Sequence, residues 1–309
     1  MKNGKFITIG ITGACLIVAV VLALWRFSYL DKPTPNKLLV TASFYPLYYF
    51  ADRIGGDIAN VINVTPAGVE PHDYEPTARE IVNMERGDML IINGGGLETW
   101  GTRISDDIAN SSVRVVVAGN GLMNKGSYKG GVFIPDSHVW LDPILAIEQV
   151  KKIRDGFIEI DPSNMEIFQN NAEILLNELS DLNERYQVEL NSCKSRDMIT
   201  SHSAFIYLAD RYRLNQISIA GQSPDEEPSI QRIAEIIELV KKKNIRYIFF
   251  ESLLDPRLSE VIADEIGASI LPLDPLEGLS ENDLMAGKNY FTQMEMNLNN
   301  LKIALRCTN

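Results

Sequence analysis

Only three histidines occur among the 309 residues, and each lies within a distinctive local motif. His72 stands in Glu-Pro-His-Asp-Tyr-Glu-Pro, His138 in Asp-Ser-His-Val-Trp-Leu-Asp-Pro, and His202 in Thr-Ser-His-Ser-Ala-Phe. Neutral imidazole is the commonest protein ligand for zinc-like metal ions. Three imidazoles and one carboxylate would complete a tetrahedral coordination shell. The sequence therefore predicts a metal site built from these three histidines.

The spacing of the histidines indicates how such a site would be assembled. His72 and His138 are 66 residues apart, and His138 and His202 are 64 residues apart. Zinc fingers gather ligands from short local spacings, and helical zinc proteases use two histidines four residues apart. Neither pattern is present. We therefore expect tertiary structure to bring the ligands together from distant loops, between two halves of the protein.

The fourth ligand is expected to be a carboxylate, because no histidine is left and neither Cys193 nor Cys307 has a second thiol nearby. Asp274 is the leading candidate, since it directly follows an apolar, strand-like run. Glu251 is the second candidate. Its alternative role is to accept a hydrogen bond that orients a metal-binding histidine.

A zinc-dependent hydrolase that uses the same histidines is an alternative from another functional class. A catalytic zinc keeps one coordination position open for water, whereas four protein ligands leave none open. Ser201 and Ser203 flank His202, but no Gly-x-Ser-x-Gly nucleophile elbow surrounds them. We therefore predict a metal-binding protein that is not an enzyme. A surface adhesin and a metal sensor remain open as further alternatives.

The composition describes an acidic globular protein. Forty-one acidic and 29 basic residues give a net charge of −12, and 45% of the residues are hydrophobic. Because phosphate contacts supply most of the affinity of nucleic-acid-binding proteins, this charge argues against such binding. The negative charge is compatible with attracting cations, although it more often serves solubility. The length suggests two domains of ordinary size.

The N-terminus carries a hydrophobic segment over residues 6–25, preceded by Lys2 and Lys5. About twenty helical residues would cross a hydrocarbon core of roughly 30 Å. We expect an uncleaved membrane anchor, followed by a short tether that ends near residue 37. A cleaved signal peptide and lipidation at Cys15 are the alternatives. All three place the rest of the chain on the extracytoplasmic side of the membrane.

Strand-like runs alternate with helical runs in two blocks, residues 38–160 and 194–309. The expected strands cover 38–43, 62–65, 89–92 and 113–117 in the first block, and 198–200, 217–220, 246–250 and 269–273 in the second. Helical patterns begin near residue 77 and cover 229–243 and 282–306. This alternation predicts parallel sheets with helices on their faces. His202, Glu251 and Asp274 would lie at the carboxyl ends of strands, where ligands bind in open α/β sheets.

A long helical pattern separates the two blocks. Residues 163–190 contain no glycine or proline, and their apolar positions recur at intervals of three and four. We expect a linking helix within residues 161–193. The predicted fold class is therefore α/β, with two lobes that are each a mainly parallel sheet flanked by helices, joined by one long rigid helix. Cys193 and Cys307 could form a disulfide or remain two unrelated buried thiols.

These motifs, in this order, resemble those of the zinc/manganese substrate-binding proteins of ABC importers, the ZnuA-like family, from about Leu38 to the C-terminus. Further matching motifs are Glu-Pro-Ser at 227–229, Ile-Phe-Phe-Glu at 248–251 and Leu-Asp-Pro-Leu at 273–276. The resemblance implies a metal ion held in the cleft between the lobes by His72, His138, His202 and Asp274. It also implies delivery of that ion to an ABC permease and its ATPase. We expect the chain to be a monomer.

The ligand types bear on the choice of metal. A shell of three histidines and one carboxylate suits Zn²⁺, whereas Mn²⁺ prefers a shell richer in oxygen. Manganese-selective relatives tend to carry a second carboxylate where His202 stands. Zinc-binding relatives often have a His-rich loop before the second histidine, and residues 119–135 contain no histidine. Zn²⁺ is therefore the expected cargo, with Mn²⁺ as the alternative.

Overall fold

The computed structural model describes residues 37–108, 112–221, 228–253 and 257–308, and the structural statements below concern these residues. The segment at residues 6–25, for which an anchor is expected, lies outside them. Within the described ranges, no helix is both long enough and apolar enough to cross a membrane.

The N-terminal lobe is built on a parallel sheet of four strands in the order β2-β1-β3-β4. The strands are β1 (Leu38–Ala42), β2 (Ala59–Asn63), β3 (Met89–Ile92) and β4 (Arg114–Val117), and the helices between them are α2 (Tyr45–Gly55), α3 (Ala78–Glu85) and α4 (Gly101–Ile108). Every residue of β3 is buried. A parallel strand reads as a continuous apolar run when helices cover both faces of its sheet.

The C-terminal lobe repeats this architecture with the strand order β10-β9-β7-β8. Its strands are β7 (Asp197–Thr200), β8 (Asn215–Ser218), β9 (Tyr247–Phe250) and β10 (Ser269–Pro272), and its helices are α7 (Ile206–Arg211), α8 (Ile230–Lys243), α9 (Arg257–Ile266) and α10 (Glu281–Met285). All strands of this sheet are parallel, so their carboxyl ends meet at one edge. The fold class expected from the sequence is confirmed.

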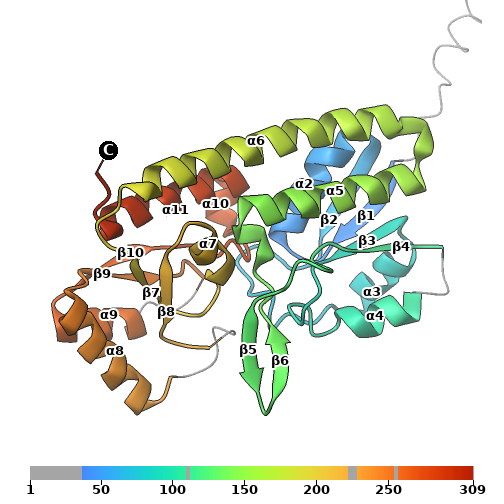
Figure 1. Ribbon diagram of the computed structural model, residues 1–309. Helices are drawn as coiled ribbons and strands as arrows, with labels where there is room; N and C mark the ends of the chain where they lie inside the picture. Colours follow the sequence, from blue (N-terminus) through green and yellow to red (C-terminus); the bar gives the residue numbers. More distant parts are fainter. Residues whose placement is uncertain (1–36, 109–111, 222–227, 254–256, 309) are drawn as a thin grey trace, which may run out of the picture. The chain divides into compact units, whose positions relative to one another are not determined.

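Helix α6 (Met165–Asn191) joins the two lobes and runs along both of them (Figure 1). It packs on α5 (Pro143–Ile160) of the N-terminal lobe, where Phe168 lies 5.0 Å from Phe157 between ring centroids. Toward its other end, Tyr186 lies 5.1 Å from Tyr212 of the C-terminal lobe. One continuous hydrophobic core includes buried residues from both sheets and from α6. The same helix thus buries side chains of both lobes.

Several elements were not assigned from the sequence, namely helices α4, α5 and α9 and a two-stranded hairpin. Helix α5 precedes α6, and a short antiparallel hairpin of β5 (Gly126–Lys129) and β6 (Val132–Pro135) projects from the N-terminal lobe (Figure 1). The helix expected over 282–306 is divided into α10 and α11 (Tyr290–Leu305). Gly287 adopts a left-handed φ of 76°, and Asn289 caps the N-terminus of α11 by accepting from the Thr292 N–H. These two local features end one helix and begin the next.

A disulfide joins Cys193, just after α6, to Cys307, just after α11. The question that the sequence left open is thereby answered in favour of pairing. The bond connects positions 114 residues apart. It ties the end of the linking helix to the C-terminus of the second lobe.

Removal of this bond is expected to destabilise the protein without changing its fold. Because the cross-link restricts the unfolded chain over a long loop, a Cys193→Ser/Cys307→Ser variant should lose about 2–4 kcal/mol of unfolding free energy. Denaturant titration of the oxidised protein, the reduced protein and the double variant measures this loss. The reduced protein should match the variant. Equal stability of all three would contradict a structural role for the bond.

Candidate metal centre

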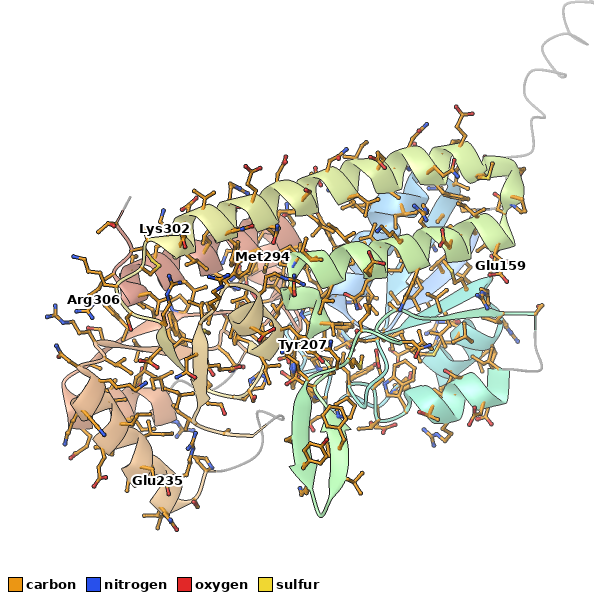
Figure 2. The ribbon with its side chains drawn as sticks, in the orientation of Figure 1. Glu159, Tyr207, Glu235, Met294, Lys302 and Arg306 are labelled. Atoms are coloured by element: carbon orange, nitrogen blue, oxygen red, sulfur yellow. A yellow bond between two sulfur atoms is a disulfide. The ribbon has the colours of Figure 1, made fainter. Side chains whose placement is uncertain are left out.

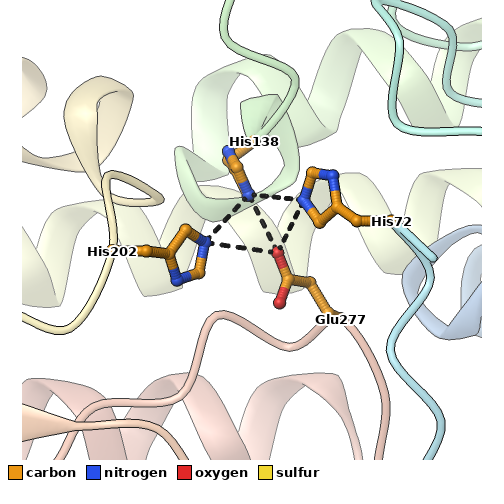
Figure 3. Close-up of side chains that lie close together, drawn as sticks. All are labelled: His72, His138, His202 and Glu277. Atoms are coloured by element: carbon orange, nitrogen blue, oxygen red, sulfur yellow. Dashed lines mark hydrogen bonds and ion pairs between the residues drawn. The ribbon is translucent and has the colours of Figure 1, made fainter. Parts of the chain in front are cut away.

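The side chains of His72, His138, His202 and Glu277 converge between the two lobes (Figure 3). The Nε2 atom of His138 lies 3.3 Å from that of His72 and 3.4 Å from that of His202. Glu277 Oε1 lies 2.8 Å from the Nε2 atom of His138, 3.3 Å from that of His72 and 3.6 Å from that of His202. All four atoms lie within 4.8 Å of one another.

These separations fit a tetrahedral metal shell. Zinc binds histidine nitrogen and carboxylate oxygen at roughly 2.0–2.1 Å, so the edges of the tetrahedron are about 3.3 Å long. Five of the six separations among the four ligand atoms, from 2.8 to 3.6 Å, bracket this value, and the sixth is within 4.8 Å. The four side chains therefore surround a position that a zinc-sized ion can occupy with few adjustments.

The site is almost closed to solvent. The side chains of His138, His202 and Glu277 are 1%, 0% and 1% exposed, whereas that of His72 is 13% exposed. An ion at this position would be surrounded by protein on most sides. The partial exposure of His72 marks the side on which the site is least covered.

His138 is held by the segment between the hairpin and α5. It is the N-cap of a short 3₁₀ helix, η2 (Val139–Leu141), and its Nδ1 lies 2.9 Å from Asp136 Oδ1. The same carboxylate oxygen accepts from the His138 backbone N–H at 3.0 Å. Asn93, directly after β3, donates to the carbonyl of Ser137 at 2.9 Å. With Nδ1 directed at Asp136, Nε2 is left to face the other three groups.

His202 follows β7, and its orientation comes from the neighbouring strand β9. Glu251, the residue after β9, places both carboxylate oxygens 2.7 Å from His202 Nδ1 and accepts from the His202 N–H at 3.1 Å. Because β7 and β9 are parallel neighbours, their carboxyl ends bring these two residues together. Glu251, the second candidate for the fourth ligand, is not part of the four-residue cluster. Its contacts with His202 Nδ1 fit its alternative role, that of orienting a metal-binding histidine.

His72 lies in the loop between β2 and α3. The backbone N–H of His72 donates to Glu70 Oε1 at 3.3 Å. Earlier in the loop, Gly68 donates to the carbonyl of Leu279 at 3.0 Å, two residues after Glu277 in the chain. A capping box between Thr77 and Glu80 fixes the start of α3 at the end of the loop. These contacts hold the loop against the C-terminal lobe.

The structure places Glu277, and not the expected Asp274, beside the histidines. Asp274 is 4% exposed, and its Oδ1 accepts from the backbone N–H of Leu276 at 2.7 Å. This contact closes a turn after β10, within which Leu276 adopts a left-handed φ of 54°. The turn reverses the chain and directs Glu277 toward the histidines. The carboxylate of Asp274 is thus engaged in shaping the loop that carries Glu277.

The loop is also held through its backbone by two other elements. Asn297 of α11 accepts from the N–H of Asp274 at 2.9 Å and donates to its carbonyl at 2.7 Å. Trp140, two residues after His138, donates its indole N–H to the carbonyl of Pro275 at 2.7 Å. A sequence signal for Glu277 did exist, since it is a second acid in the same loop after the strand. Nothing in residue type or spacing ranks it above Asp274.

Glu277 and the imidazoles of His138 and His202 shift one another's pKa values toward their charged forms. Burial alone would lower the pKa of His138, but the carboxylates of Asp136 and Glu277 outweigh it and raise that pKa to about 9. Burial is likewise outweighed at His202, whose pKa is raised well above its usual value by Glu251 and Glu277. For Glu277, burial would raise the pKa, yet the three histidines hold it well below its usual range. Without a metal, the raised pKa values of His138 and His202 favour protons on these two imidazoles, which offset the charge of the buried carboxylate.

Two further buried acids border the cluster. Burial and the negative charge of Glu277 raise the pKa of Glu70 well above its usual range. Burial raises the pKa of Asp274 to about 6. The histidines hold the pKa of Glu277 well below its usual range, and its carboxylate is the one directed at the three imidazoles.

The metal-free protein should lose stability as the pH rises above neutrality. The folded-state pKa of His138, about 9, lies above its ordinary value of 6.5, so its contribution is complete below pH 6.5 and is lost as the pH rises through about 9. We expect a loss of up to about 3 kcal/mol in unfolding free energy. Thermal and denaturant unfolding in the presence of chelator measure it. Asp136→Asn should flatten the profile, and a flat profile in the unmodified chain would contradict the assignment.

Comparisons with known proteins agree with this architecture. A family model described as "Zinc-uptake complex component A periplasmic" (ZnuA) matches residues 40–304. The zinc-binding lipoprotein AdcA of Streptococcus pneumoniae (strain ATCC BAA-255 / R6) is 36% identical over 299 residues, which cover 93% of this chain and 60% of that protein. The chain thus spans less than two thirds of the length of that relative.

Two relatives match over most of their own length. The high-affinity zinc uptake system protein ZnuA of Bacillus subtilis is 34% identical over 281 residues, which cover 87% of this chain and 88% of the relative. The crystal structure of the Zn(II)-bound ZnuA-like domain of S. pneumoniae AdcA superposes with a TM-score of 0.77 and 39% identity, covering 87% of this chain and 99% of that domain. The chain therefore belongs to the ZnuA family of zinc-uptake components.

Proposed function

We propose that this protein captures Zn²⁺ on the extracytoplasmic side of the membrane and delivers it to an ABC permease driven by its ATPase. The observation that carries the proposal is the set of four ligand atoms, three imidazole nitrogens and one carboxylate oxygen, whose separations match a zinc tetrahedron. The ligands would be His72, His138, His202 and Glu277. Asp274 would act indirectly, by holding the loop of Glu277.

The donor set favours zinc over manganese. Three of the four atoms are imidazole nitrogens, which suit Zn²⁺, whereas Mn²⁺ prefers carboxylate, carbonyl and water oxygens in an octahedral shell. The burial of the site also favours zinc, because it leaves little room for the water ligands of a six-coordinate manganese ion. Manganese remains the second candidate cargo.

Asp136 and Glu251 would strengthen zinc binding without contacting the metal, by orienting two of the histidine ligands. Each lies against the Nδ1 atom of one histidine, at 2.9 Å for His138 and 2.7 Å for His202. A carboxylate in this position fixes the tautomer that presents Nε2 to the metal and increases the basicity of that nitrogen. Zinc would replace the protons on these two imidazoles, so that protons and metal compete for the same atoms.

The arrangement also argues against hydrolysis. Four protein ligands would fill a tetrahedral zinc shell, and no position would be left for a reactive water. Transport needs only capture and release of the ion. The role as a binding component of an importer therefore accounts for the site more simply than catalysis does.

The partners and location follow from the family. The names of two relatives describe a zinc-binding lipoprotein and a zinc uptake system protein. For this chain we propose attachment to the membrane through residues 6–25, with lipidation at Cys15 or cleavage of a signal as the alternatives. Mass spectrometry of the mature protein from the membrane fraction distinguishes the three.

The identity of the fourth ligand can be tested with two conservative substitutions. Glu277→Gln removes the negative charge beside the histidines and should weaken zinc binding by roughly a hundredfold or more, beyond the 10- to 100-fold typical of supporting residues. Asp274→Asn keeps an oxygen that can accept from Leu276 and should change affinity by less than about tenfold. Competition with a chromogenic chelator measures both constants. Stronger weakening by Asp274→Asn would reverse the assignment.

Zinc uptake by cells tests the proposed function itself. Deletion of the protein should lower cellular zinc in zinc-limited medium and leave manganese unchanged, and the wild-type gene should restore zinc where Glu277→Gln does not. Elemental analysis by mass spectrometry measures both metals. A fall in manganese alone would identify manganese as the cargo. Unchanged levels of both metals would favour the adhesin or sensor alternatives.

A further inference from the structure

The short helix α7 of the C-terminal lobe contacts the segment that carries His138 on both sides of that histidine. Three of its residues reach across to the N-terminal lobe: Tyr207, Asp210 and Arg211. The contacted residues are Lys125 and Asp136 before His138, and Asp142 after it. We refer to these three α7 residues and their partners as the α7 clamp.

The hydroxyl of Tyr207 makes the contact that lies nearest to His138 in the chain. Tyr207 is only 2% exposed and lies where the two lobes meet (Figure 2). Its hydroxyl donates to the backbone carbonyl of Asp136 at 2.9 Å and accepts from the N–H of Lys125 at 3.3 Å. Asp136 is the residue whose carboxylate fixes the ring of His138. The Tyr207 hydroxyl therefore acts on His138 through the backbone of Asp136.

Two ion pairs complete the clamp. Asp210 lies 2.9 Å from the Lys125 ammonium group, at the start of the hairpin. Arg211 contacts both carboxylate oxygens of Asp142, which is 2% exposed and caps the N-terminus of α5. The segment that contains His138 is thus attached to α7 at its beginning and at its end.

The same helix is directly continuous with the His202 segment. α7 begins at Ile206, four residues after His202. The carbonyl of His202 accepts from the Thr200 hydroxyl at 2.7 Å and from the Gln216 amide at 3.1 Å, so His202 is fixed to its own lobe. Through α7, the C-terminal lobe, which contains His202, also contacts the segment of the N-terminal lobe that contains His138.

Beside the α7 clamp, the two lobes are separated on one side by a hollow, although buried side chains of α7 and of the segment after His138 pack in one hydrophobic core. An open hollow of about 580 Å³ lies between the hairpin and the C-terminal lobe, and Lys125, Tyr128, Ile206 and Asp210 are among the residues that line it. The polar contacts of the α7 clamp lie along this hollow, and the hydrogen bond from Trp140 to Pro275 holds the segment after His138 by a separate route.

We propose that Tyr207 is a positioning residue for metal binding, and that the α7 clamp sets the distance between His138 and His202. This inference rests on the proposed function, since it concerns the retention of zinc by those two histidines. The hydroxyl group is the part of Tyr207 that matters, whereas its ring belongs to the structural core. Loss of the hydroxyl frees the carbonyl of Asp136, so that the His138 turn can shift and zinc escapes sooner.

The test compares Tyr207→Phe with Tyr212→Phe in the full chain. Tyr212 is a matched control, because it is also buried and its hydroxyl donates to Asn183 on α6, at 3.1 Å. Zinc dissociation into excess chelator should be about three- to tenfold faster in Tyr207→Phe, as expected for one buried hydrogen bond, and unchanged in Tyr212→Phe. In the zinc-loaded protein, the His138 Nδ1 proton should exchange faster with solvent only in Tyr207→Phe, while the backbone amides of α6 keep their exchange rates, which distinguishes a local change from a loss of global stability.

A second pair of variants, at exposed residues, tests the α7 clamp without changing a buried side chain. Asp210 and Asp155 have equally exposed side chains, 64% each, and each forms an ion pair, with Lys125 and Arg154 respectively. Asp210→Asn should speed zinc release, and Asp155→Asn should not. Equal release rates in all four variants, with stoichiometric zinc in the unmodified chain, would refute the clamp. Absence of stoichiometric zinc in the unmodified chain would instead refute the metal site.

Discussion

A buried carboxylate that faces three imidazoles is the interaction around which this structure is organised. The side chain of Glu277 is 1% exposed, and burial of an unpaired carboxylate would cost several kcal/mol. In the metal-free protein, His138 and His202 offset this charge by holding protons more tightly, with the pKa of His138 raised to about 9 and that of His202 raised well above its usual value. A divalent cation would satisfy the same carboxylate with two charges at one point. The buried carboxylate of Glu277 therefore requires a positive charge beside it. We expect zinc to supply that charge and to displace the protons from the imidazoles.

The rest of the fold places four loops from two lobes around that charge. His202 and Glu277 follow strands β7 and β10 of one parallel sheet, and His72 and His138 lie in loops of the other lobe. Helix α6 buries side chains of both lobes, and the Cys193–Cys307 disulfide fixes its end. Closer to the site, Trp140 and Tyr207 carry hydrogen bonds from one lobe to the other. The ligands are thus held by long-range tertiary contacts, in agreement with their wide spacing in the sequence.

Much of this arrangement could be predicted from residue types and periodicity. The alternating strand and helix patterns led to two parallel sheets, and the glycine- and proline-free pattern over 163–190 led to α6. The rarity of histidine directed attention to His72, His138 and His202, whose Nε2 atoms the structure brings together. The sequence placed His202 and Glu251 at the carboxyl ends of strands, and the structure shows that these are the neighbouring strands β7 and β9.

The fourth member of the cluster could not be chosen in this way. Asp274 and Glu277 are acids in the same loop, and their roles depend on the turn between them. That turn places Leu276 in the left-handed region of backbone conformation. Leucine rarely adopts this conformation, so the turn could not be predicted from the sequence. The α7 clamp could not be predicted either, since it depends on contacts between segments about 70 to 80 residues apart.

The most direct test of the account is X-ray absorption spectroscopy at the zinc edge of the loaded full chain. The structure predicts a four-coordinate ion with three nitrogen ligands and one oxygen ligand at roughly 2.0–2.1 Å, and with the scattering pattern of three imidazole rings. The spectrum of Glu277→Gln should lose this signature, and that of Asp274→Asn should keep it. A five- or six-coordinate ion, or fewer than three imidazoles, would contradict the central claim that these four side chains form a complete zinc shell.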